Sequence, residues 1–208
     1  MSITLAVAKG RLAEDLLTKL IDAGIDCADA LNPGRRLIVP SADGSISFIF
    51  VKPSDVPTYV ERGVADAGVC GKDTLLEENK PLLEMLDLGF GKCRLCICGK
   101  QEMHEAGLRS SAYRVATKYP RIARALFERR YVNAEIIELH GSVELAPLVG
   151  LSDVILDIVE SGGTLFANGL SIIEEIYPIS ARLVVNRVSL KTRSDEIKRL
   201  LDALKEAV

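Results

Sequence analysis

Residues 157 to 165 have the clearest chemical signature in the chain. The apolar run 154–156 is followed by two acids and then by a Ser-Gly-Gly-Thr turn. Successive backbone amides and two hydroxyls in such a turn can surround a terminal phosphate. Ionised carboxylates accept hydrogen bonds from hydroxyl groups, so acids beside a phosphate suit a ligand such as a ribose 5-phosphate. The candidate residues are Asp157, Glu160, Ser161, Gly162, Gly163, Thr164 and Leu165.

A structural reading of the same acids stays open at this point. Asp157 would then be a buried strand acid that is satisfied locally, and Glu160 a solvated residue at the start of a helix.

Five further apolar runs end in Gly, Ser, Thr or Lys shortly before a helical pattern. Because the carboxyl ends of parallel strands share one edge, and helix N-termini offer unpaired N–H groups there, such ends form anion sites. We therefore expect one crevice, lined from both halves of the protein, that binds a multiply charged anion. The residues that follow these runs include Lys9, Gly10, Arg11, Lys52, Gly71, Lys72, Asp73, Lys118, Tyr119, Gly141, Ser142 and Glu144.

Strand-like and helical patterns alternate along the chain, which indicates an α/β protein with largely parallel sheets. A hairpin is expected around 41–44, and a helix capped by Ser54 is expected to follow it. Other strands are expected at 3–8, 67–70, 93–98, 113–116, 135–139, 153–159 and 182–188. We expect two lobes, with residues 94–177 inserted into a lobe formed by 1–93 and 178–208.

The composition indicates a globular protein and excludes several classes. The 208 residues are 48% hydrophobic, and the net charge is -3, which argues against general nucleic-acid binding. The N-terminus carries no basic leader or cleavage site, and no apolar run has the length of a membrane span, so a cytoplasmic protein is expected.

The cysteines and histidines are expected to be structural rather than metal ligands. In a strand at 93–98, Cys93 and Cys96 would lie on opposite faces, which is wrong for chelating one ion. The alternative to a metal site is that these cysteines are small hydrophobic residues buried in the core. His104 is expected to be a structural or surface residue, and His140 is at a strand end where a structural and a ligand role remain equally open.

The segment 157–170 resembles the phosphoribosyl-diphosphate loop of the ATP phosphoribosyltransferases, the enzymes that catalyse the first step of histidine biosynthesis. Nearly the whole chain is similar to that family, in matching order. The other segments that carry the resemblance are 8–12, 55–63, 66–73, 116–119 and 141–147. The resemblance implies a two-lobed fold like that of the type II periplasmic binding proteins, with a central cleft and mixed, mostly parallel sheets.

The resemblance also implies a reaction and roles for the residues. N1 of the ATP adenine would attack C1 of phosphoribosyl diphosphate, with Mg²⁺ carried by the substrate and no protein metal site. Arg11 and Arg35 would be the catalytic cations, with Arg36 the weaker candidate beside Arg35. Residues 157 and 160–165 would bind phosphoribosyl diphosphate, and the other strand-end residues ATP or pyrophosphate.

The chain ends after a helix around Leu200, and in this respect it resembles the short form of this family. The partners that the resemblance implies are those of the short form. That form works with a regulatory subunit resembling histidyl-tRNA synthetase in a hetero-octamer, and its catalytic subunit is expected to be dimeric. The runner-up is a non-enzymatic two-lobed small-anion binding protein. A P-loop kinase is disfavoured because its G-x-x-x-x-G-K-[ST] pattern is absent.

Overall fold

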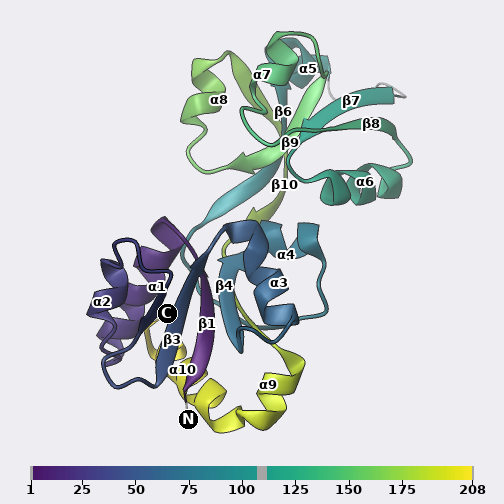
Figure 1. Cartoon of the computed structure of the whole chain (residues 1–208). Coiled ribbons are helices and arrows are strands. Elements are labelled where there is room, and N and C mark those ends of the chain that lie inside the picture. The colour runs from purple at the N-terminus through teal and green to yellow at the C-terminus, as the bar shows by residue number, and fades with distance from the viewer. Residues whose placement is uncertain (1, 107–111, 208) are drawn as a thin grey trace. The chain divides into compact units, whose positions relative to one another are not determined.

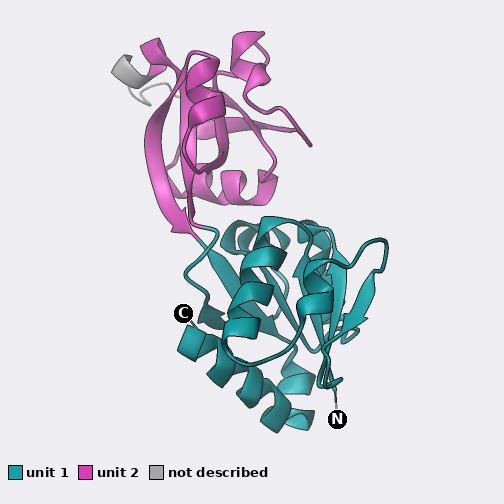
Figure 2. Cartoon of the chain, turned by 90° about the vertical axis from the view of Figure 1, so that its left-hand side faces the viewer, with its two compact units in different colours: residues 1–91, 180–208 teal, residues 92–179 magenta. Residues whose placement is uncertain are grey.

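The computed structural model describes residues 2–106 and 112–207, with side chains left out at 104–106. The chain divides into unit 1, Met1–Gly91 with Ser180–Val208, and unit 2, Lys92–Ile179 (Figure 2). These boundaries lie two residues from those expected from the sequence. Within the described part of the chain, no helix is both long enough and apolar enough to cross a membrane.

Unit 1 is built on a six-stranded sheet in the order β2-β3-β1-β4-β11-β5. Strands β3, β1 and β4 are parallel, whereas β2 and β11 pair antiparallel to their neighbours. The elements of this unit, labelled in Figure 1, are β1 (Ile3–Ala8), α1 (Arg11–Asp22), α2 (Ala28–Leu31), β2 (Ile38–Pro40), β3 (Ile46–Val51), the 3-10 helix η1 (Pro53–Asp55), α3 (Val56–Glu61), β4 (Ala67–Gly71), α4 (Lys72–Glu78), β5 (Leu83–Asp87), β11 (Ala181–Val185), α9 (Arg187–Thr192) and α10 (Ser194–Ala207).

The two faces of this sheet carry side chains of different size. Leu5 and Val7 of β1 pack into a large cluster with α1 and α10, whose Leu16 and Leu200 are buried there. The opposite face presents small side chains such as Ala6 to α3. A Cβ at Gly68 would lie 2.7 Å from Val60 Cγ2, so glycine lets α3 approach the strand closely.

Unit 2 is built on a five-stranded sheet in the order β10-β6-β9-β7-β8. Strands β9, β7 and β8 are parallel, and β6 pairs antiparallel with both β9 and β10. The elements of this unit are β6 (Cys93–Lys100), α5 (Gln101–Ala106), β7 (Ala112–Thr117), α6 (Pro120–Arg129), β8 (Asn133–Glu138), α7 (Leu145–Leu148), β9 (Val154–Val159), α8 (Gly163–Ala167) and β10 (Leu170–Ile179).

One face of this second sheet supports residues 157–165, the segment that contains the Ser-Gly-Gly-Thr turn. Ile155 and Val159 of β9 pack in a cluster with Cys96 and Cys98 of β6 and with Leu165 of α8. The helix that follows the Ser-Gly-Gly-Thr turn is therefore anchored on the same face of β9 from which Asp157 projects, because alternate strand residues share a face.

The expectation that Ser54 caps a helix is wrong. Residues Pro53–Asp55 form a 3-10 turn, and α3 begins at Val56 without a side-chain cap from its N-cap residue Asp55. The Ser54 hydroxyl instead donates to the Asp55 carboxylate at 3.4 Å. The expected hairpin is confirmed, because β2 and β3 pair antiparallel around 41–44.

The expected strand at 182–188 is too long, and two strands were not foreseen. Strand β11 ends at Val185, and Val188 lies in α9 with 66% of its surface exposed. Strands β5 and β10 lie at sheet edges, where polar residues replace the apolar pattern. Strand β10 also contains two register shifts, which break the two-residue period that marks a strand in a sequence.

Asn186 stops β11 and starts α9, and its loss is expected to destabilise unit 1. Its Oδ1 accepts from the amides of Val188 and Ser189, at 2.8 and 3.1 Å, and its Nδ2 donates to the Val60 carbonyl at 2.7 Å. The Val60 carbonyl also accepts from the Gly63 amide at 3.1 Å, so it keeps one partner without Asn186. Because Asn186→Ala removes the cap of α9 and one buried hydrogen bond, we expect it to lower the free energy of unfolding by about 1–3 kcal/mol.

Urea unfolding checks this expectation. The matched control is Asn32→Ala, because Asn32 is exposed and should change stability by less than about 0.5 kcal/mol. Equal unfolding midpoints for the two variants would contradict the capping role of Asn186.

Candidate active site

A pocket of about 210 Å³ lies at the carboxyl end of β9 in unit 2. It brings together all seven residues that the sequence predicts for phosphoribosyl diphosphate. Glu144, the residue before α7, also lines the pocket. The apolar residues Ile155, Ile158 and Val159 complete the lining. The pocket thus places three acids beside a Gly-rich turn, on one side of one sheet.

The turn owes its shape to Gly162. This residue has φ 79°, in the left-handed region, and forms the N-cap of α8. A Cβ at this position would lie 2.6 Å from Cε2 of Phe166. The Gly163 amide meets Ser161 Oγ at 3.4 Å, and Thr164 and Ser161 are exposed. Ser161, Gly163 and Thr164 therefore lie at the surface, where a phosphate can reach them, whereas Gly162 is buried.

The acids of the pocket differ in burial. Asp157 is only 7% exposed, and its Oδ1 accepts from the Ile158 amide at 2.9 Å. Glu160 is exposed at the end of the strand, and Glu144 is half-buried. The local bond to Ile158 matches part of the structural reading of Asp157, but the same carboxylate still lines the pocket, so it remains a candidate acceptor for ligand hydroxyls.

Two cysteines lie beneath this pocket as part of the core. Cys96 pairs with Asp157 across the β6–β9 ladder, and Cys96 and Cys98 are fully buried. Burial first, and then the charges of Cys96, Asp157 and Glu144, raise the pKa of Cys98 to about 12. A thiol with such a pKa stays protonated near neutral pH, so it neither acts as a nucleophile nor readily binds a metal.

The cysteines should consequently differ in their reactivity toward a thiol reagent in the folded protein. Burial also raises the pKa of Cys27 to about 11 and raises those of Cys70 and Cys96. Only Cys93 is partly exposed. At pH 8 we expect Cys93 to be modified first and the four buried thiols to react only after guanidinium unfolding, as measured by mass spectrometry of digested protein. Rapid native labelling of Cys98 would contradict this.

Unit 1 presents exposed cations at the carboxyl ends of its parallel strands. Ala8 pairs with Val51, and the ladder continues with a bond from the Lys9 amide to the Val51 carbonyl at 3.1 Å. Lys9 and Lys52 therefore leave neighbouring strands at the same edge, and Arg11 follows as the first residue of α1 after its N-cap Gly10. All three side chains are exposed, so this edge can receive an anion.

Arg35 and Arg36 are distinguished by their contacts. The Arg36 guanidinium forms an ion pair with Asp29 at 3.5 Å, and its Nε donates to the Pro33 carbonyl at 3.3 Å. The Arg35 side chain is exposed and makes no hydrogen bond or ion pair within residues 2–106 and 112–207. This difference favours Arg35 as the cation that is available to a ligand, as the sequence predicts.

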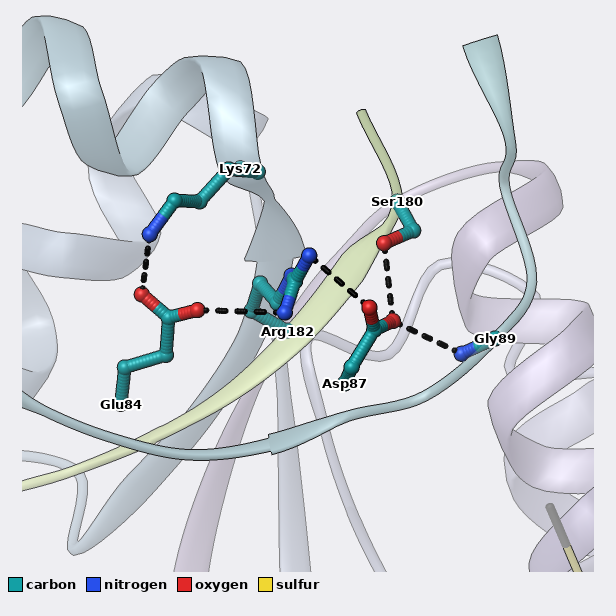
Figure 3. Close-up of polar contacts among 6 residues, drawn as sticks. All are labelled: Lys72, Glu84, Asp87, Gly89, Ser180 and Arg182. Carbon is teal, nitrogen blue, oxygen red and sulfur yellow. Dashed lines mark hydrogen bonds and ion pairs between the residues drawn. The ribbon is translucent and has the colours of Figure 1, made fainter. Parts of the chain in front are cut away.

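The end of β4 and the start of α4 hold the predicted residues Gly71, Lys72 and Asp73. Asp73 is buried, and its carboxylate folds back so closely over Gly71 that a Cβ there would collide with it. The Lys72 ammonium does not extend freely into solvent, because it forms an ion pair with Glu84 of β5 (Figure 3). Glu84 gave no signal in the sequence, since β5 itself was not foreseen.

The remaining predicted residues lie at the carboxyl ends of β7 and β8. The Tyr119 amide donates to the buried Thr117 hydroxyl at 2.9 Å and precedes α6, and Lys118 between them is exposed. Gly141 and Ser142 follow β8, and Ser142 has φ 44°. Because β7, β8 and β9 are parallel, these turns share an edge with the pocket. They do not line the pocket itself, and their ligand contacts stay predictions.

The acids of the pocket are oxygen ligands of the type that magnesium takes in proteins. No cluster of three or more potential metal ligands occurs among the residues that the structure describes. Magnesium commonly keeps several waters and takes only one or two protein carboxylates beside phosphate oxygens. Asp157, Glu160 and Glu144 offer such carboxylates at the edge of the phosphate turn.

These features define an α/β protein of two units, each with a mixed sheet, in which an acid-lined pocket and a Gly-rich turn at strand ends can hold a phosphorylated sugar. The family model described as "HisG: ATP phosphoribosyltransferase" matches residues 52–206. The chain belongs to the ATP phosphoribosyltransferase family.

Similar proteins span nearly the full chain. An ATP phosphoribosyltransferase of Thermoanaerobacter sp. (strain X514) is 51% identical over 207 residues, which cover 100% of this chain and 96% of the relative. One from Sorangium cellulosum (strain So ce56) is 50% identical over 205 residues, covering 99% and 95%.

A solved structure confirms the fold class. The ATP phosphoribosyl transferase (HisG:HisZ) complex from Thermotoga maritima contains a chain with a TM-score of 0.83 and 37% identity, covering 99% of this chain and 98% of that one. The expected α/β fold with two mixed sheets is therefore confirmed. The expectation that the sheets are mostly parallel is wrong, because among the described residues four strand pairs are parallel and five are antiparallel.

Proposed function

We propose that this chain is the catalytic subunit of a short-form ATP phosphoribosyltransferase. It would transfer the phosphoribosyl group of phosphoribosyl diphosphate to N1 of ATP and release pyrophosphate, the first step of histidine biosynthesis. The observation that carries this proposal is the pocket formed by Asp157 and residues 160–165 in a chain that belongs to the family.

The phosphoribosyl end of the substrate is assigned to this pocket. The 5-phosphate would accept hydrogen bonds from the amides and hydroxyls of 161–164, which carry no carboxylate of their own. Asp157 and Glu160 would accept from the ribose hydroxyls. Several fixed hydrogen bonds would hold C1 in one orientation, and orientation of this kind removes much of the entropic barrier to a two-substrate reaction.

The chemical step needs charge stabilisation more than proton transfer. Adenine N1 has a lone pair that can form the new bond to C1, while the bond from C1 to the pyrophosphate oxygen breaks and its electron pair leaves with that oxygen. Arg11, with Lys9 and Arg35, supplies positive charge for the departing oxygens. When bound with the substrate, magnesium neutralises part of the same diphosphate charge.

The second substrate is assigned to the other strand ends. Lys72, Asp73, Lys118, Tyr119, Gly141, Ser142 and Glu144 are proposed to contact ATP or pyrophosphate. The exposure of Lys118 supports such a role, because a lysine at a strand end can bind phosphate as a mobile point charge.

A regulatory partner and an assembly are part of the proposal. The similar solved structure is described as a HisG:HisZ complex, and this chain covers 98% of the matching chain. We therefore propose that the protein acts in the cytoplasm with a regulatory subunit resembling histidyl-tRNA synthetase, as a hetero-octamer that contains dimers of the catalytic subunit.

A pyrophosphate-release assay tests the function. We expect release only when ATP, phosphoribosyl diphosphate and magnesium are all supplied, and faster release when the candidate regulatory subunit is added. A non-enzymatic anion-binding protein would bind the substrates but release no pyrophosphate in either case, and that result would refute the proposal.

A further inference from the structure

Lys72 belongs to a chain of alternating charges inside unit 1 (Figure 3). Its ammonium contacts Glu84 Oε2, and Glu84 Oε1 meets the Arg182 guanidinium at 3.3 Å. Arg182 also contacts Asp87 at 2.8 Å, and Asp87 accepts from the Ser180 hydroxyl at 2.8 Å. The four charged groups balance one another, so the positive charge of Lys72 is already compensated.

The pairing of the strands places the Glu84 backbone before the carboxyl end of β4. Gly71 pairs with Ala181 at the end of β4, whereas Glu84 pairs with Val184, which in turn pairs with Gly68. Glu84 therefore lies at the level of Gly68, well before the carboxyl end of β4. Lys72 follows Gly71 directly, and in the ion pair its ammonium is directed toward Glu84 (Figure 3).

We propose that Glu84 is a displaceable counter-ion that masks Lys72 until a polyphosphate binds at the carboxyl end of β4. This inference rests on the proposed function, in which Lys72 contacts ATP or pyrophosphate. In this scheme the ammonium exchanges one carboxylate for a phosphate group, and Glu84 lowers the affinity of the site for anions. Glu84 is thus an affinity-setting residue that does not itself touch the ligand.

The exchange is energetically accessible for two reasons. The Lys72 and Glu84 side chains keep 28% and 33% of their surface exposed, and ion pairs with this degree of exposure contribute a factor of about five or less to an equilibrium. When the Lys72 ammonium moves to the ligand, Glu84 remains paired with Arg182, so the negative charge of Glu84 still has a cationic partner. Arg182 Nε is buried without a hydrogen-bond partner among the described residues, so this guanidinium still has a donor to spare.

Calorimetric titration of the full chain with inorganic pyrophosphate, in magnesium buffer of low ionic strength, tests the exchange. We expect Glu84→Gln to lower the Kd by about three- to fivefold, because the ammonium no longer has a charged competitor. Lys72→Met should raise the Kd. When Glu84→Gln is added to Lys72→Met, the gain should disappear, since the proposed effect acts only through Lys72.

The matched control is Glu61→Gln. Glu61 pairs with Lys80 at 3.4 Å in the same unit, with side chains that are 26% and 30% exposed, so this variant changes the net charge equally without touching Lys72. It should leave the Kd unchanged. Glu84→Asp is a second variant in case the first fails to fold, and the shorter carboxylate should give a smaller gain in affinity.

Several outcomes would overturn the inference. Weaker pyrophosphate binding by Glu84→Gln would show that Glu84 positions Lys72 rather than masking it. If Glu84→Gln raised the affinity for pyrophosphate equally in the Lys72→Met background, Glu84 would act only by through-space repulsion of the anion. If the wild-type chain binds no pyrophosphate at millimolar concentration, this anion site falls, whereas the transferase activity is still judged separately by pyrophosphate release.

Discussion

Arg11→Ala is expected to lower kcat by about 10²- to 10³-fold while changing the KM values little. Arg11 is an exposed cation at the start of α1, at the edge where β1 and β3 end. In the proposed mechanism its guanidinium interacts most strongly with charge that develops on the departing pyrophosphate, and loss of one such donor typically costs this much in turnover. Steady-state pyrophosphate release under saturation with both substrates measures the effect.

Arg36→Ala is the control for this variant. Arg36 is also exposed and carries the same charge, but its guanidinium is held by Asp29 and the Pro33 carbonyl. We expect less than about a twofold change in kcat for it, as for surface changes in general. Full turnover by Arg11→Ala, or equal losses in the two variants, would remove Arg11 from its catalytic role.

Gly162→Ala is expected to lower kcat/KM for phosphoribosyl diphosphate by about 10- to 100-fold. The substitution strains a residue with φ 79° and brings a methyl group within 2.6 Å of the Phe166 ring. The ring can move outward, since Phe166 is 55% exposed, but the backbone strain remains. Small displacements of groups that position a substrate cost rate factors of this size. The loss should appear mainly in KM, and initial rates over a range of substrate concentrations measure it.

Gly169→Ala separates backbone strain from damage to the pocket. Gly169 has φ 70°, and a Cβ there would meet nothing within 4 Å, so it shares the left-handed conformation but lies outside the pocket. Both variants should lose a similar amount of thermal stability, of the order of 1 kcal/mol. A rise in KM with Gly169→Ala as large as that with Gly162→Ala would indicate that the phosphate turn is not at 161–164.

Sequence patterns were most informative where one side of an element is buried. The helix expected around Leu200 is present as α10, because Ile197, Leu200 and Leu204 all pack into one core. The pattern failed at β5 and β10, because an edge strand covered on one side can carry acids such as Glu174, which is held there by Arg130 at 2.7 Å.

The sequence by itself determined the Gly-rich turn and the family, because a Ser-Gly-Gly-Thr turn preceded by acids is a local arrangement of consecutive residues. Tertiary structure alone decided which residues of each unit come into contact. It brought Glu144 to the pocket, freed Arg35 while Asp29 holds Arg36, and paired Lys72 with Glu84. Such contacts depend on strand order and register, which bring together residues with no fixed spacing along the chain.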